Sequence, residues 1–168
     1  VIVVLPAGQA TGPGQVEGGS TRSESVRRGL AAVPSDATLV CVHDAARPFA
    51  SPVIFQRVIS AVVDGADAAV PGVAVVDTIK QVNESEVVVA TPRRETLRAV
   101  QTPQAFRASS LRRAHEQGGE GTDDAALIER IGGEVVVVEG EVVNRKITSP
   151  EDLEWAVAHA NRLLAGEI

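Results

Sequence analysis

The chain has one cysteine, three histidines and no methionine among its 168 residues. A single cysteine, Cys41, excludes an internal disulfide, and its place inside an apolar run indicates a small buried hydrophobe rather than a nucleophile. His43, His115 and His159 show no spacing typical of a metal site, so we expect no protein-built metal centre and treat all three as structural or exposed.

No apolar run is long enough to span a bilayer, and the apolar start of the chain lacks the basic flank of a signal peptide. The 16 basic and 22 acidic residues give a formal charge of -6, which disfavours nucleic acid and anionic membranes as partners. Any phosphate site must therefore be local. A cytoplasmic location is expected, because a lone cysteine fits a reducing compartment.

The length is that of one domain, residues 1–168, with enough chain for a three-layer α/β core. Apolar runs rich in valine predict buried strands, and they alternate with segments of helical spacing. The predicted strands are Val1–Leu5, Thr38–Val42, Ala68–Val76 with an interruption at Pro71–Gly72, a short strand from Leu97, and Val135–Val138. The predicted helices end near Ala32, Gly65, His115, Ile131 and Leu164. Ser51–Pro52 opens the second of these helices, and a turn after the strand from Leu97 leads into the third by Phe106. A glycine-rich loop, Gly118–Gly121, precedes the fourth helix, which Thr122-Asp123-Asp124 caps, and Ser149–Pro150 opens the last.

The strand Thr38–Val42, which is expected at the centre of the sheet, stops abruptly at His43 and Asp44. In an open parallel sheet this edge is where ligands bind, because strand ends and helix starts leave a crevice with unpaired backbone donors. Asp44 could hold a metal-bound polyphosphate or a sugar hydroxyl, and the planar fork of Arg47 suits phosphate. The alternative is that Asp44 caps the next helix and pairs with Arg47 on the surface.

A glycine pair, Gly18–Gly19, precedes hydroxyl side chains and a helix start. Paired glycines allow a ligand to approach the backbone closely, and a helix start offers free N–H groups, which together favour a nucleotide cradle. Taken alone, an ordinary N-cap at Ser20 or Thr21 with Glu24 completing a capping box is the commoner explanation.

Residues 79–90 break the βα rhythm and predict a β-hairpin with a polar turn at residues 83–86. A lone apolar hairpin is marginal in water, so we expect it to pack against a second copy of the subunit. Arg93 and Arg94 follow at its base, where a solvated basic turn is the simpler alternative.

Six segments, in order and over nearly all of the chain, resemble the 2-C-methyl-D-erythritol 4-phosphate cytidylyltransferase family. Each is weak alone, but the ordered set is specific. They are Gly18-Gly19-Ser20-Thr21-Arg22-Ser23-Glu24-Ser25-Val26, Val42-His43-Asp44-Ala45-Ala46-Arg47-Pro48, Asp77-Thr78-Ile79-Lys80, Leu97–Gln104, Thr122-Asp123-Asp124-Ala125 and Lys146–Leu153.

The resemblance implies a Rossmann-like three-layer nucleotidyltransferase with a protruding β-hairpin arm, residues 78–95, that forms a homodimer. It implies Mg²⁺-dependent transfer of CMP from CTP to 2-C-methyl-D-erythritol 4-phosphate, a polyol phosphate, in isoprenoid precursor biosynthesis. The products would be 4-diphosphocytidyl-2-C-methyl-D-erythritol and pyrophosphate.

The resemblance also implies roles for individual residues. Asp44 and Lys146 would be catalytic, and Arg94 would reach the substrate phosphate in the partner's site. The implied nucleotide-binding residues are Gly18, Gly19, Ser20, Arg22, Ser25 and Asp44. The implied substrate-binding residues are Arg47, Thr78, Arg94, Thr102, Thr122 and Lys146.

The chain departs from the family's pattern at its start. The family opens with Pro-Ala-Ala-Gly-x-Gly-x-Arg and a Pro-Lys, whose cations stabilise the reacting phosphorus, and Val1–Ala7 instead matches a later strand. We therefore expect the sequence to lack an N-terminal strand and glycine-rich loop. The alternatives are a ribitol-5-phosphate cytidylyltransferase and an inactive truncated nucleotide-binding domain. A Rossmann oxidoreductase is disfavoured because no GxGxxG opens a βαβ unit.

Overall fold

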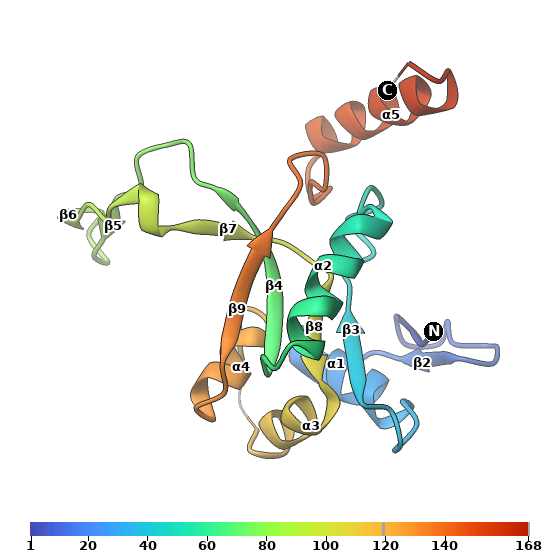
Figure 1. The fold of residues 1–168 in the computed structure, drawn as a ribbon. Coiled ribbons are helices and arrows are strands. Elements are labelled where there is room, and N and C mark those ends of the chain that lie inside the picture. Colours follow the sequence, from blue (N-terminus) through green and yellow to red (C-terminus); the bar gives the residue numbers. More distant parts are fainter. Residues whose placement is uncertain (119, 168) are drawn as a thin grey trace.

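A mixed five-stranded sheet forms the centre of the protein in the computed structural model, which describes residues 1–118 and 120–167 (Figure 1). Three strands run parallel: β3 (Leu39–Val42), β4 (Ala68–Ala74) and β9 (Val135–Glu139). Between β3 and β4 lies β8 (Gln104–Arg107), which is antiparallel to both. The carboxyl ends of the three parallel strands therefore meet at one edge, where β8 begins.

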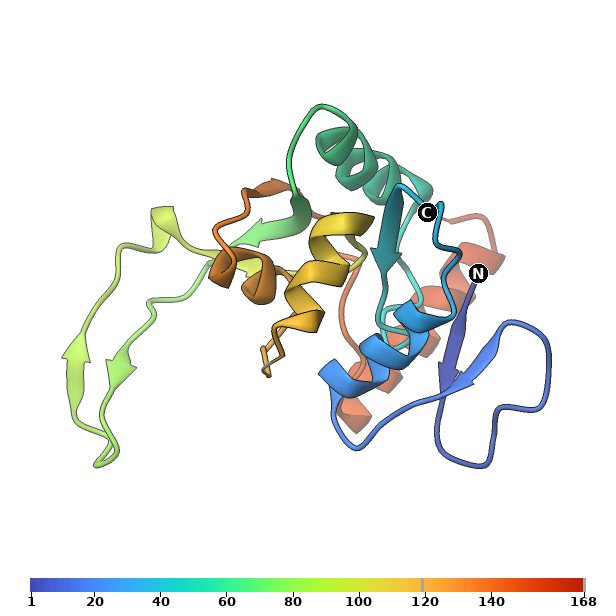
Figure 2. The ribbon, with the colours of Figure 1, turned by 90° about the horizontal axis from the view of Figure 1, so that it is seen from below.

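Helices cover both faces of this sheet, which confirms the expected three-layer α/β fold (Figure 2). On one face, α2 (Pro52–Val63) packs Val58 and Val62 against Ala69 and Ala105. The helices α1 (Arg22–Ala31), α3 (Ala108–Glu116) and α4 (Ala125–Arg130) cover the other face.

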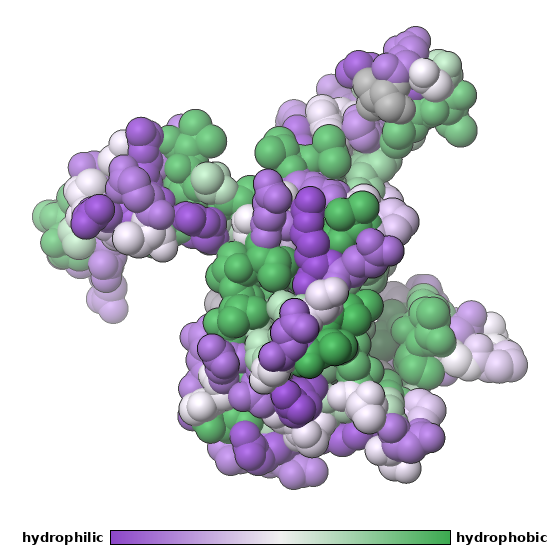
Figure 3. Space-filling view, in the orientation of Figure 1, coloured by the Kyte–Doolittle hydropathy of each residue, from purple (hydrophilic) through white to green (hydrophobic). Residues whose placement is uncertain are grey.

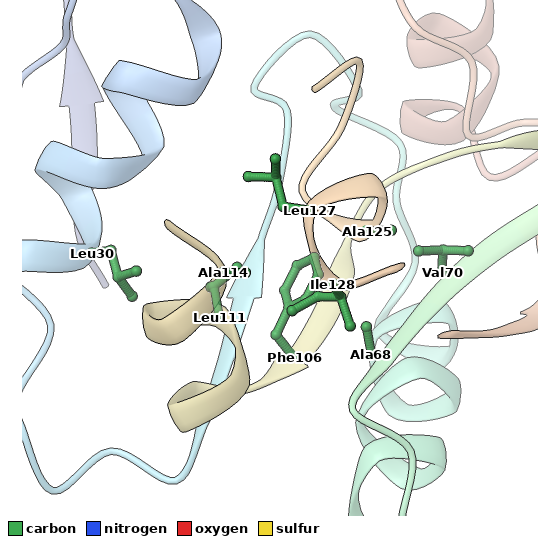
Figure 4. Packing of buried hydrophobic residues seen from close by; sticks show 9 residues of the cluster. All are labelled: Leu30, Ala68, Val70, Phe106, Leu111, Ala114, Ala125, Leu127 and Ile128. Carbon is green, nitrogen blue, oxygen red and sulfur yellow. The ribbon is translucent and has the colours of Figure 1, made fainter. Parts of the chain in front are cut away.

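The core on that second face centres on Phe106, which is fully buried among side chains of three helices (Figure 4). Leu30 of α1, Leu111 of α3 and Ile128 of α4 belong to the same cluster. Because successive strand residues point to opposite faces, Phe106 and its neighbour Ala105 serve the two separate cores.

Two expectations about the strands were wrong. β8 falls where the sequence predicted a turn and a helix entry, because a four-residue strand without β-branched side chains carries almost no periodic signal. The strand β4 runs through Pro71–Gly72 without the expected interruption. Its partner changes there, from β8 to β7 (Arg98–Val100), so the missing N–H of Pro71 falls at a junction between two ladders.

The N-terminal strand is also not the buried element that was expected. Of the predicted strand, only Val3–Leu5 is extended, as β1. It pairs in parallel with β2 (Gln15–Glu17) in a separate two-stranded sheet that packs on α1. Val3 is 46% exposed and Val4 is 37% exposed. β3 likewise lies at an edge of the described sheet rather than at its centre.

The predicted hairpin is present as β5 (Gln81–Val82) and β6 (Val88–Ala90), and it projects away from the body (Figure 1). The side chain of Asn83 fixes the turn by accepting hydrogen bonds from the N–H groups of Ser85 and Val87, both at 3.0 Å. A 3₁₀ turn, Arg94–Thr96, lies at its base. The space-filling view shows hydrophobic residues at the surface of this arm, whose four valines are 40–59% exposed (Figure 3).

The last helix, α5 (Pro150–Leu164), begins with a complete capping box between Ser149 and Asp152. The expected caps of α1 at Thr21 and of α2 at Ser51 are also confirmed. Part of the expected glycine-rich loop Gly118–Gly121 lies outside the described residues. None of the described helices combines the length and apolar character needed to cross a bilayer.

Candidate active site

A cleft of about 290 Å³ opens at the edge of the sheet where β3 ends and β8 begins. Segments far apart in the sequence form its walls: the start of α1, the loop after β3, the start of β8, the loop before α4 and the loop after β9. Six predicted site residues line it together, namely Arg22, Asp44, Arg47, Thr102, Thr122 and Lys146.

Asp44 lies between two cations on the cleft wall. Its Oδ2 is 3.1 Å from Nζ of Lys146, and its Oδ1 is 3.7 Å from Nε of Arg22. The side chain of Asp44 is 19% exposed, whereas that of Lys146 is 45% exposed. One carboxylate thus holds two cations at the surface of the cleft, where their remaining donors can meet an anion. Asp44 does not simply pair with Arg47, as the alternative interpretation proposed.

Thr102 links the loop after β3 to the start of β8. Its hydroxyl accepts a hydrogen bond from the N–H of Asp44 at 3.0 Å and lies 3.0 Å from Nδ1 of His43. The other ring nitrogen, Nε2, is 3.1 Å from the carbonyl oxygen of Arg47. A neutral imidazole protonated at Nε2 satisfies all three contacts. Burial lowers the pKa of His43 more than the Arg47 carbonyl and Asp44 raise it, which favours this neutral form.

Arg47 points into the cleft from a half-buried position. Its Nη1 donates to the carbonyl oxygen of Asn144 at 2.8 Å, and the N–H of Ile147 donates to the carbonyl oxygen of Ala46 at 2.8 Å. These bonds join the loop after β3 to the loop that carries Lys146. Burial lowers the pKa of Arg47, although Asp44 opposes this effect. Its Nε is buried without a hydrogen-bond partner in the described part of the chain.

Behind the cleft, Arg22 is held by a buried carboxylate. Its Nη1 donates to Oδ2 of Asp124 at 2.8 Å, and Oδ1 of Asp124 lies 3.0 Å from Nε2 of His115. Burial alone raises the pKa of Asp124, but the bond to His115 and the charge of Arg22 outweigh it and lower the pKa. The prediction that His115 is structural therefore agrees with its buried position.

An aromatic cluster on α5 holds the segment that carries Lys146. The guanidinium of Arg145 lies 4.7 Å above the ring of Trp155 and makes an ion pair with Asp152 at 3.0 Å. Phe49, two residues after Arg47, packs edge-on against Trp155 and His159. The two loops that contribute Arg47 and Lys146 are thereby fixed to the same helix.

Four predicted nucleotide-binding residues, Gly18, Gly19, Ser20 and Ser25, lie at the start of α1 and do not line this cleft. Thr21 caps the helix, and the Glu24 carboxylate accepts from the N–H of Ser20 at 2.7 Å. That bond, with the Ser20 hydroxyl and Arg28, lowers the pKa of Glu24 to about 2. A Cβ at Gly19 would overlap the Glu24 side chain, so a larger residue there would require Glu24 to move. The cap at Thr21 is thus confirmed, but Glu24 bonds to Ser20 and does not complete the expected capping box; nucleotide contact remains a prediction.

The remaining two predicted residues lie at the base of the arm, apart from the cleft. Thr78 is exposed, and Arg94 is 55% exposed and donates from Nη1 to the carbonyl oxygen of Val76 at 2.8 Å. Their proposed roles in substrate binding stay predictions.

Sequence reasoning missed Gln104 and Asp123 as cleft residues. Nε2 of Gln104 donates to Oδ2 of Asp123 at 2.8 Å, while Oε1 of Gln104 is buried without a partner among the described residues. The missed strand β8 explains the omission of Gln104, since only that strand points its side chain toward the loop before α4.

Comparisons with known proteins agree on one family. The family described as IspD, 2-C-methyl-D-erythritol 4-phosphate cytidylyltransferase, matches residues 9–162. The chain is 53% identical over 142 residues to a bifunctional enzyme IspD/IspF of Nitratidesulfovibrio vulgaris, which covers 82% of the chain. It is 49% identical over 150 residues, or 85% of the chain, to a 2-C-methyl-D-erythritol 4-phosphate cytidylyltransferase of Streptomyces avermitilis.

Solved structures give the same result. The crystal structure of 2-C-methyl-D-erythritol 4-phosphate cytidylyltransferase from Thermus thermophilus matches with a TM-score of 0.82 and 42% identity, covering 95% of this chain and 81% of that one. The chain spans 36% of the length of the Nitratidesulfovibrio relative and 60% of the length of the Streptomyces relative.

Proposed function

Because the chain belongs to the 2-C-methyl-D-erythritol 4-phosphate cytidylyltransferase family, we propose that its protein transfers CMP from CTP to 2-C-methyl-D-erythritol 4-phosphate. In this reaction an oxygen of the substrate phosphate attacks the α-phosphorus of CTP, and pyrophosphate leaves. The observation that carries the proposal, beside the family match, is the cleft in which Arg22, Arg47 and Lys146 lie around the carboxylate of Asp44.

The proposed chemistry asks little of a protein beyond positioning and charge. Two polyanions must lie side by side while negative charge develops on the reacting phosphate oxygens. Lys146 and Arg22 are held by Asp44 until an anion arrives, and then provide hydrogen-bond donors to it. Arg47 adds a planar fork from a half-buried site, where its charge is less screened by water. No covalent nucleophile is required.

We also propose that Mg²⁺ enters with the triphosphate of CTP. In the described residues, no group of three or more His, Cys, Asp or Glu side chains is arranged to hold a metal. Asp44 nevertheless suits this ion, because Mg²⁺ is commonly bound through one or two carboxylates together with substrate phosphates and water. When bound, Mg²⁺ would neutralise phosphate charge, and Asp44 would then exchange a cationic partner for the metal.

The arm is proposed to join two copies of the protein. Its valines at positions 82, 87, 88 and 89 are exposed, and an isolated two-stranded hairpin is only marginally stable in water. Arg94 at its base is proposed to contact the substrate phosphate of the partner. Arg94→Ala should then weaken binding of the polyol phosphate about 10- to 100-fold and leave CTP binding unchanged, as measured by titration calorimetry. Equal losses for both ligands would argue against a shared site.

The decisive experiment measures pyrophosphate release by the complete protein. Release is expected only when CTP and 2-C-methyl-D-erythritol 4-phosphate are both supplied. Ribitol 5-phosphate serves as the matched alternative acceptor, and equal turnover with it would overturn the proposed specificity. A protein that binds CTP but releases no pyrophosphate with either acceptor would support the non-catalytic alternative.

A further inference from the structure

The most deeply buried charge beside the cleft belongs to Asp124, whose side chain is 0% exposed and does not line the cleft itself. Each of its carboxylate oxygens has one partner, Arg22 at 2.8 Å and His115 at 3.0 Å. Burying a carboxylate is unfavourable unless it is fully paired, so this arrangement needs an explanation.

Helix capping does not explain the carboxylate. Asp124 is the N-cap residue of α4, but its side chain makes no capping hydrogen bond. The neighbouring Asp123 does this instead, accepting from the N–H of Ala126 at 2.9 Å. The Asp124 side chain turns away from its own helix, toward α3 and the start of α1.

The contact fixes the direction in which Arg22 points. Only Nη1 of Arg22 makes a hydrogen bond within the described residues, and that bond goes to Asp124. The guanidinium is planar, so fixing Nη1 orients the remaining donors as well. One of these, Nε, lies on the cleft side, 3.7 Å from Asp44, and the side chain is 31% exposed.

The same contact joins two walls of the cleft. Within residues 120–124, the loop before α4, which carries Thr122, makes three polar contacts with the start of α1 in the described structure. Two are exposed or long: Thr21 to Glu120 at 3.1 Å and the N–H of Gly121 to Ser23 at 3.5 Å. The ion pair of Arg22 with Asp124 is the shortest of the three, and its carboxylate is fully buried, so it is the strongest contact between the two segments.

We infer that Asp124 is a positioning residue that sets the Arg22 guanidinium at the cleft wall, and that His115 orients Asp124 from behind. The inference rests on the proposed function and deepens it, because Arg22 is one of the residues proposed to bind CTP. The series of contacts from His115 through Asp124 to Arg22 then links the rigid packing of α3 and α4 to the groups that would bind the nucleotide.

The test is a double-variant comparison in the complete protein with Arg22→Ala, Asp124→Asn and both together. Each single change should weaken CTP binding and lower kcat/KM for CTP, up to about 100-fold, since small displacements of a positioning group have effects of this size. Once Arg22 is alanine, Asp124→Asn should add less than about 3-fold. Effects that multiply would overturn the inference, because they would mean that Asp124 acts independently of Arg22.

Asp67→Asn is the matched control. Asp67 also accepts from an α3 side chain, Ser110 at 2.6 Å, and pairs with an arginine, but it lies at the opposite edge of the sheet. It should lower the melting temperature without changing CTP affinity; a comparable loss of affinity would mean that general destabilisation explains both variants.

A second pair of variants keeps the inference testable if Asp124→Asn does not fold. His115→Gln preserves a donor toward Asp124 and should retain CTP affinity, whereas His115→Leu should lose it about 10-fold; equal affinities would count against the orienting role. CTP affinity is measured by calorimetry, so the inference can fail while pyrophosphate release succeeds, and the reverse.

Discussion

Replacing Thr102 with valine removes a hydroxyl on which two other groups of the cleft depend. Thr102 is 5% exposed, and its hydroxyl contacts the N–H of Asp44 and Nδ1 of His43 at 3.0 Å each. Valine has nearly the same shape, so packing is preserved while both contacts disappear. A hydrogen bond contributes about 1 kcal/mol net, and a donor left without a partner costs about 1–3 kcal/mol. The free energy of unfolding should therefore fall by about 2–3 kcal/mol.

The assay is urea unfolding of the complete protein followed by far-ultraviolet circular dichroism. With a denaturant slope of about 2 kcal/mol/M, the midpoint should drop by about 1–1.5 M. Thr102→Ser is the control, because it keeps the hydroxyl and loses one methyl group, for about 1 kcal/mol. Asp44 is displaced only in the valine variant. We therefore expect kcat/KM to fall in the valine variant and to stay near the value of the unaltered protein in the serine variant. A valine variant as stable as the serine variant would refute the proposed link.

Three further predictions concern charge, pH and assembly. Lys146→Ala removes one proposed phosphate contact, so kcat/KM for pyrophosphate release should fall about 10- to 100-fold, and an unchanged value would exclude Lys146 from the reaction. Because burial lowers the pKa of His43, its contribution to stability is present above pH 6.5 and is lost as the pH falls through the lower folded-state pKa. His43→Asn should thus lose less stability than the unaltered protein between about pH 7.5 and pH 5.5, as urea midpoints would show; parallel losses contradict this. Val88→Lys should shift the protein from dimer to monomer in sedimentation experiments, whereas Glu84→Lys in the turn of the arm should not, and a dimer that tolerates both changes would exclude the arm.

The helices were the most predictable part of the fold, because caps and breakers bound them. Ser51 with Pro52, and the capping box at Ser149, mark helix starts that the structure confirms. The strands were less predictable. A strand such as β8 forms because β3 and β4 both hydrogen-bond to it. The four residues Gln104–Arg107 show no sequence pattern that predicts these partners.

The site was predicted in part for a similar reason. Asp44 and Arg47 follow directly from a strand end, which is a local signal. Gathering Lys146 and Thr122 beside them required the family resemblance, because they come from distant loops. Asp124 was passed over as a capping residue, since a buried partner such as His115 cannot be identified from sequence spacing.

The chain has one tryptophan, Trp155, whose ring lies under the guanidinium of Arg145. The residue after Arg145 is Lys146, which pairs with Asp44 at the cleft. We expect an anion that draws Lys146 away from Asp44 to shift the neighbouring Arg145 guanidinium, and so to change the polarity around the indole. The emission spectrum of Trp155 therefore offers an intrinsic optical signal of cleft occupancy, readable in unlabelled protein without any turnover.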